Sequence, residues 1–175
     1  MNAEELLKQY ANGTRDFSGS SLSEANLANA NLSHAVLVGA LLDGANLSRA
    51  NLSYSNLQGA DLNGADLSSA NLSGANLEGA ILDGAILEGA MLDSANLNQA
   101  ELTVAKLVEA DLTHAELQRA NLSGANLDKA DLSGADLNTA DLQQANLKDA
   151  ELQDANLSGA NLEKTNLEGT VLDES

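Results

Sequence analysis

The sequence predicts a single solenoid that turns a corner every five residues, with a short helix at its amino end. Leucine occupies 31 of the 32 positions spaced five apart from Phe17 to Leu172, and alanine occupies 27 of the 32 positions two residues earlier. Thirteen of the 14 glycines lie two residues after this central residue. No insertion interrupts the series, so one repeating structure is expected from about residue 15 onward.

A five-residue period excludes the two commonest regular structures. Five helical steps rotate a side chain by about 140°, so the leucines of a helix would not share a face. An extended strand alternates its side chains with a period of two, which an odd spacing does not fit. A coil that bends every five residues places the central leucine and the preceding alanine inward. The glycines then fall where a type II turn requires positive φ.

The tandem unit, typified by Ala120-Asn121-Leu122-Ser123-Gly124, resembles the pentapeptide-repeat family over about residues 15–174. This resemblance implies an all-β fold, a right-handed quadrilateral β-helix of about eight four-sided coils. With coils ~4.8 Å apart, the solenoid would be ~38 Å long. Residues 20 apart would stack in columns. The predicted core includes Phe17, Leu22, Leu62, Ala120, Leu122 and Leu162.

Residues 1–14 differ in pattern and predict a capping helix over 2–12, ahead of a β-helix at 15–175 in one domain. Asn2 and Glu5 have the spacing of a capping box, and Leu6, Leu7 and Tyr10 fall on one helical face. An open solenoid end exposes unpaired backbone and core side chains and needs a cover. We therefore expect the helix to cover the first coil, with Phe17 beneath it.

The carboxyl end has no comparable segment after Leu172, which leaves two alternatives. Threonine and charge, at Thr165, Thr170, Asp173 and Glu174, would blunt the last coil, or that coil would pair with a second copy about a two-fold axis. Acidic side chains would repel one another in such a pair. The expected state is a monomer, or a weak dimer through this end.

The net charge of −18, from 26 acidic and eight basic residues, disfavours binding to nucleic acid or to an anionic membrane and favours a basic protein surface. No cysteine is present to form a disulfide or a thiolate site. The start of the chain lacks the basic and apolar regions of a secretory signal, and no apolar run approaches a membrane span, so a cytoplasmic location is expected.

No catalytic signature is found, and neither an enzyme activity nor a cofactor is expected. His34 and His114 fall in one column but 80 residues apart, about 19 Å, too far to share a metal. Instead, His34 is expected to stack on Tyr54 one coil along, and His114 to approach Asp111. Asparagine and aspartate, which precede the central residue at 14 and seven of the 32 sites, suit hydrogen bonding to nearby backbone and stacked ladders.

Two outward features are candidate partner-binding sites. The first is an acidic ladder, Asp111, Asp131 and Glu151, in one column of a face that has no lysine or arginine and also carries Asp154. Like charges ~4.8 Å apart cost about 1 kcal/mol even in water. The second is an apolar belt on three successive faces of one coil, formed by Ile81, Ile86 and Met91.

Three functions remain open for this surface. The first is a non-enzymatic acidic scaffold or protein-interaction module with no assigned target. The second, implied by the resemblance to family members associated with quinolone resistance, is a DNA mimic that binds a type II topoisomerase such as gyrase. The third is weak divalent-cation binding on the acidic ladder, since hard cations favour carboxylates.

Overall fold

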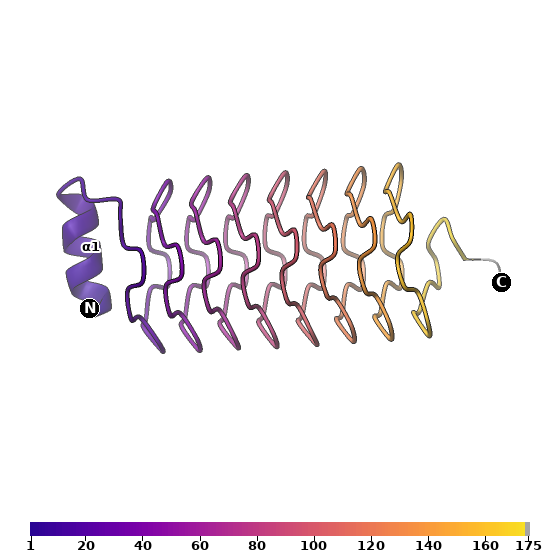
Figure 1. Ribbon diagram of the computed structural model, residues 1–175, viewed down its shortest axis with the longest axis horizontal. Coiled ribbons are helices and arrows are strands. Elements are labelled where there is room, and N and C mark those ends of the chain that lie inside the picture. Colours follow the sequence, from indigo (N-terminus) through magenta and orange to yellow (C-terminus); the bar gives the residue numbers. More distant parts are fainter. Residues whose placement is uncertain (174–175) are drawn as a thin grey trace.

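The protein is a straight rod with its two termini at opposite ends, as the computed structural model shows (Figure 1). The structure describes residues 1–173; Glu174, one of the acids predicted to blunt the carboxyl end, lies outside them. The one helix of this described part, α1, spans Ala3–Ala11 and lies across the amino end of the rod. It lacks the length and apolar character needed to cross a bilayer.

The rod is a solenoid held together by parallel β-bridges between residues 20 apart, from Asp16–Val36 to Asn146–Asn166. One coil therefore contains four pentapeptides. Each bridge is an isolated residue pair, because the chain turns again before a longer strand can form. The backbone bonds between coils are short and regular, as in Leu122 N to Asp141 O at 2.7 Å. The prediction of a repeat β-solenoid is confirmed.

A turn closes each pentapeptide, with the alanine-site N–H donating to the preceding leucine carbonyl, as in Ala125 N to Leu122 O at 3.0 Å. The third residue of the turn has positive φ at every corner from Gly19 to Gly169, which is the feature that defines a type II turn. Eighteen of these corners are not glycine, and they include Val104 at φ 52°. The turn is therefore imposed by the hydrogen bonds between coils, and glycine eases it without being required.

The core is a continuous column of leucine and alanine. Phe17, Leu22, Leu62, Ala120 and Leu122 are buried as predicted, each at most 2% exposed. The prediction for Leu162 is wrong: this side chain is only half-buried, as are Leu157 and Leu167. The physical reason is that, within residues 1–173, no further coil stacks on these residues.

The helix α1 forms the predicted cap. Asn2 Oδ1 accepts from Glu5 N at 2.8 Å, whereas the Glu5 carboxylate accepts from Gln9 Nε2 at 3.3 Å, so the observed bonds form one half of a capping box. Leu6 is fully buried in the same cluster as Phe17, while Leu7 and Tyr10 are half-buried against it.

Arg15 explains why the first alanine site is not alanine. Its guanidinium stacks on the Tyr10 ring at 3.8 Å from the centroid and donates to the Tyr10 carbonyl at 2.8 Å. The Tyr10 hydroxyl donates to Ser33 O at 2.7 Å. These contacts fasten α1 to the first coil.

Candidate interaction surface

Each ladder aspartate uses one carboxylate oxygen to hold its own turn. Asp111 Oδ1 accepts from Thr113 N at 3.0 Å and from Thr113 Oγ1 at 2.8 Å, and Asp131 Oδ1 accepts from Ser133 N at 2.9 Å. Many asparagines and aspartates before a central residue make this bond to the N–H two positions on, as Asn121 does with Ser123. The predicted local bonding is confirmed, and it engages Oδ1 of each ladder aspartate.

The ladder differs from Asp136 and Asp141 in what lies on the next coil. Asp136 accepts an amide N–H from Asn156 at 2.9 Å, and Asp141 accepts one from Asn161 at 3.1 Å. In the ladder, Asp111 is bridged to Asp131 and Asp131 to Glu151, so acid lies on acid. The ladder acids therefore lack the asparagine amide that Asp136 and Asp141 each accept from the next coil.

Asparagine stacking, where it occurs, forms the predicted ladder. Asn146 Nδ2 donates to Asn126 Oδ1, and Asn166 Nδ2 donates to Asn146 Oδ1, both at 2.9 Å.

Within residues 1–173, ion pairs occur at Lys148–Glu168 and Lys164–Glu163, at 3.0 and 3.3 Å, and neither involves the acidic ladder. Asp154 is exposed at the corner of the ladder's face, with φ 57°.

The ladder does not converge on a metal site. No group of three histidine, cysteine or acidic side chains in the described chain is arranged to hold a cation. The stacked side chains project in parallel from successive coils, whereas calcium requires six to eight oxygens around one point.

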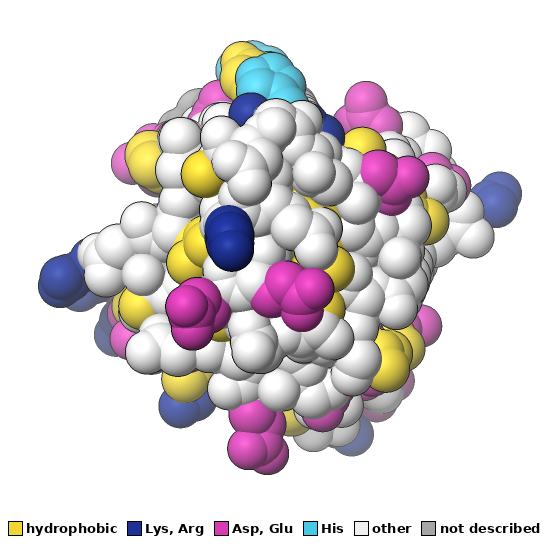
Figure 2. All heavy atoms as spheres, turned by 90° about the vertical axis from the view of Figure 1, so that its left-hand side faces the viewer, with side chains coloured by type: hydrophobic (Ala, Val, Ile, Leu, Met, Phe, Trp, Pro, Cys, Tyr) yellow, Lys and Arg dark blue, Asp and Glu magenta, His cyan; other side chains and the backbone are white. Residues whose placement is uncertain are grey.

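The apolar belt is divided by polar neighbours. Ile81 is 38% and Met91 is 42% exposed, while Ile86 is half-buried. Ile81 is bridged to Asp61 and Glu101, and Met91 to Asn71 and Asp111. Viewed from the capped end, hydrophobic side chains are likewise scattered among polar ones (Figure 2). The belt residues therefore do not form one continuous docking patch.

The structure agrees with the prediction for His34 and differs from the prediction for His114. His34 and Tyr54 stack as expected, with ring centroids 5.4 Å apart and an interplanar angle of 12°. His114 was expected to approach Asp111, but its ring lies over Gly134 of the next coil, where an added Cβ would come within 3.1 Å. The corner geometry directs the side chain along the rod and away from its own pentapeptide.

The sequence interpretation missed a shallow groove beside Val104, which is 60% exposed. The groove has a volume of about 260 Å³ and is lined by Thr103, Val104, Ser123, Gly124, Gln143 and Gln144. The sequence did mark this position as unusual, because Val104 is a β-branched residue at a corner that requires positive φ.

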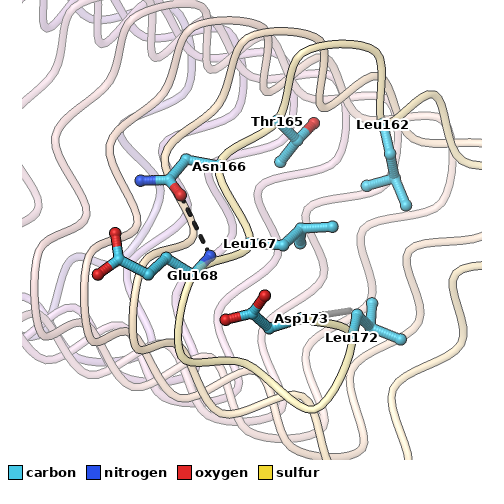
Figure 3. Close-up of a pocket in the computed structure, with 7 residues that line it drawn as sticks. All are labelled: Leu162, Thr165, Asn166, Leu167, Glu168, Leu172 and Asp173. Carbon is cyan, nitrogen blue, oxygen red and sulfur yellow. Dashed lines mark hydrogen bonds between the residues drawn. The ribbon is translucent and has the colours of Figure 1, made fainter. Parts of the chain in front are cut away.

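A second hollow lies at the carboxyl end of the described chain. It has a volume of about 650 Å³ and is lined by Leu162, Thr165, Asn166, Leu167, Glu168, Leu172 and Asp173 (Figure 3). The leucines belong to the core columns, and Leu172 is 39% exposed. The threonines satisfy nearby carbonyls, as in Thr165 Oγ1 to Leu142 O at 2.7 Å.

Comparison with known proteins accounts for this repeating architecture. The family model for pentapeptide repeats matches in eight copies, over residues 16–49, 30–68, 70–103, 105–144 and 135–173. The chain belongs to the pentapeptide-repeat family. A search of curated proteins gave no significant match.

Solved pentapeptide-repeat proteins resemble the chain over nearly its full length. HetL, from the cyanobacterium Nostoc sp. strain PCC 7120 and involved in heterocyst differentiation regulation, is 32% identical, with 99% of this chain and 98% of HetL covered at a TM-score of 0.69. A trypsin-treated variant of QnrB1, a plasmid-mediated fluoroquinolone resistance protein, is 19% identical, with 92% of each chain covered at a TM-score of 0.66. The likeness to QnrB1 shows the fold alone.

Proposed function

We propose that this pentapeptide-repeat protein is a non-enzymatic acidic scaffold that binds a basic surface on a protein partner. The observation that carries the proposal is the uncompensated ladder of Asp111, Asp131 and Glu151. In contrast to Asp136 and Asp141, these acids receive no amide N–H from an asparagine on the next coil. They lie on a face without lysine or arginine, which leaves the negative charge available to a partner.

The scaffold underlying the proposal is a right-handed quadrilateral β-helix of about eight coils. Its interior is filled by leucine and alanine, and its asparagines and aspartates bond to the turns, so most polar groups already have structural roles. Pentapeptide-repeat proteins generally serve as structural or interaction modules. HetL, the similar protein from Nostoc, is involved in heterocyst differentiation regulation, a role that a binding module can fill.

The test is capture of partners from lysate by the wild-type chain and by two charge-reversal variants. The first variant changes Asp111, Asp131 and Glu151 to lysine. The matched control changes Glu116, Asp136 and Asp141 to lysine, which alters the net charge equally on other columns. We expect a partner to be captured at low salt, released at high salt and lost only by the ladder variant. Equal loss by both variants, or no captured partner, would contradict a specific role for the ladder.

DNA mimicry is the alternative function, and charge density is the observation that favours it. Eighteen net charges over ~38 Å give about 0.5 charge per Å, close to the ~0.6 per Å of duplex DNA. A gyrase supercoiling assay tests this function, and we expect weak inhibition or none. Inhibition at low micromolar protein that disappears in the ladder variant would establish mimicry in place of the general scaffold.

A further inference from the structure

The backbone bonds between coils have a fixed direction. In the pentapeptides centred on Phe17 through Leu147, the central residue and the corner residue donate toward the carboxyl end, as in Leu122 N to Asp141 O at 2.7 Å and Gly124 N to Gln143 O at 2.9 Å. A single bond runs the other way, as in Asp141 N to Ala120 O at 2.9 Å. A carboxyl-facing edge therefore offers two N–H groups and one carbonyl per pentapeptide, and an amino-facing edge offers the reverse.

At the carboxyl end this donor-rich edge is open. Within residues 1–173, no hydrogen-bond acceptor is found for the backbone N–H groups of Leu157, Gly159, Leu162, Lys164 and Leu167. Two of these residues, Leu162 and Leu167, line the hollow of about 650 Å³ (Figure 3). Unpaired edges and exposed core leucines together form a surface suited to another coil.

At the amino end α1 occupies the place of another coil. Elsewhere a corner N–H donates to the carbonyl 19 residues on, a pattern that would assign Ser33 O to Thr14 N. Instead, Thr14 N donates to Gln9 O at 3.0 Å, and the Tyr10 hydroxyl donates to Ser33 O at 2.7 Å. The Tyr10 side chain of α1 thus makes the hydrogen bond to Ser33 O that a backbone N–H of a preceding coil would make.

We propose that the carboxyl end is a docking surface for the amino-terminal coil of a second copy of this chain, and that α1 prevents this head-to-tail contact until it is displaced. The donors at Leu157, Leu162 and Leu167 would meet the carbonyls of Asp16, Ser21 and Asn26 in the second copy. The contact would continue the packing that already joins successive coils. In contrast, two carboxyl ends related by a two-fold axis would bring mostly N–H groups against N–H groups.

The first experiment mixes the wild-type chain with a single-ended variant. Leu6→Asp and Tyr10→Ala unseat α1 in the variant, and Leu162→Lys blocks its carboxyl end. We expect a 1:1 complex of twice the 18.0 kDa chain mass by light scattering, with stronger association at high salt, because both chains carry a net charge of −18. The control partner is the wild-type chain carrying Leu162→Lys alone, which should not bind.

The same mixing experiment also has outcomes that would contradict the proposal. If the variant keeps the circular dichroism of the β-helix and no complex forms, the proposal is wrong. A complex that also forms with the Leu162→Lys partner would indicate non-specific association through the unseated helix. A dimer of the unmixed wild-type chain that is abolished by Leu162→Lys would favour the two-fold alternative.

A second experiment does not depend on unseating α1. Residues 1–175 joined directly to a second copy of residues 16–175 keep the five-residue spacing, because Phe17 then follows Leu172 by five positions. We expect hydrogen exchange at the Leu157, Leu162 and Leu167 amides to slow about tenfold or more relative to the single chain. The control joins two full chains and so retains α1 at the junction. Exchange as fast in the direct fusion as in this control would overturn the proposal.

Discussion

At the amino end of the solenoid, Leu6 of α1 is fully buried in the core cluster with Phe17, whereas at the carboxyl end Leu162 and Leu167 are only half-buried around an open hollow. The pentapeptides themselves are alike: Asn26-Leu27 and Asn166-Leu167 occupy the same column. The difference therefore arises from what stacks on the coil. In a solenoid each repeat contacts only its neighbours, so the burial of a leucine is decided about 20 residues away.

Leucine truncation at the two ends should show the largest contrast. Leu6→Ala removes a fully buried side chain and leaves a cavity, so we expect a loss of about 2–5 kcal/mol in the free energy of unfolding. Leu162→Ala removes a side chain that is already partly solvated, and its cost should be under about 1.5 kcal/mol. Urea denaturation followed by circular dichroism measures both.

Leu122→Ala is the control for a leucine with coils on both sides, and it should resemble Leu6→Ala. Equal losses for the Leu6 and Leu162 variants would mean that the carboxyl end is as well covered in solution as the amino end. That result would contradict the contrast between the ends.

Hydroxyl deletion provides a finer contrast. Tyr10→Phe leaves Ser33 O without its one described partner, so we expect a cost of about 1 kcal/mol. Thr165→Val removes the bond to Leu142 O, but that carbonyl still accepts from Ala145 N at 2.9 Å. Its cost should stay below about 0.5 kcal/mol. Thermal unfolding midpoints of the two variants measure the difference. A larger loss of stability in Thr165→Val than in Tyr10→Phe would contradict the expectation.

Much of the fold was predictable because the same five residues determine the same local structure throughout. The inward leucine and alanine, the positive φ of Gly124 and the capping role of Asn2 each depend on local spacing. Leu162 could not be placed correctly from its own pentapeptide, because its exposure depends on whether another coil stacks on it, and none does so within residues 1–173.

The candidate surface was less predictable, because side-chain direction at the corners depends on the neighbouring coil. His114 lies over Gly134 and not beside Asp111, since a corner with positive φ directs its side chain along the rod. The acidic ladder was visible as a column of Asp111, Asp131 and Glu151. Its contrast with Asp136 and Asp141 required the hydrogen bonds from Asn156 and Asn161.

Ser55 lies in the core away from both ends, so a substitution there can be compared with the end variants. It occupies an alanine site, is 2% exposed, and its hydroxyl has no hydrogen-bond partner. Ser55→Ala removes this unsatisfied group, so we expect a stabilisation of about 0.5–1 kcal/mol in urea denaturation. Ala75→Ser in the same column of the next coil should destabilise by a similar amount. Unlike the end variants, Ser55→Ala should leave amide exchange at Leu157 and Leu162 unchanged.

The smallest contrast between the ends is their response to pH. Near the amino end, hydrogen bonds from the Ser18 hydroxyl and backbone N–H lower the pKa of Asp16 below its ordinary value of 3.8. Near the carboxyl end, the hydrogen bond and charge of Glu168 raise the pKa of Lys148 above 10.5. The Asp16 contribution is present above pH 3.8 and is lost as the pH falls through its lowered pKa. The Lys148 contribution is present below pH 10.5 and is lost as the pH rises through its raised pKa.

Single substitutions separate these two contributions from the other titrating groups. The difference in unfolding midpoint between wild type and Asp16→Asn should change only below about pH 4. That for Lys148→Gln should change above about pH 10, where the lysine loses its charge, and in acid, where carboxylates are protonated. Both groups are exposed, so each change should be small and should decrease at high salt. Alkaline dependence in the Asp16 comparison, or no alkaline dependence in the Lys148 comparison, would contradict the assigned partners. Alkali is thus expected to weaken the contribution near the carboxyl end and to leave that of Asp16 unchanged.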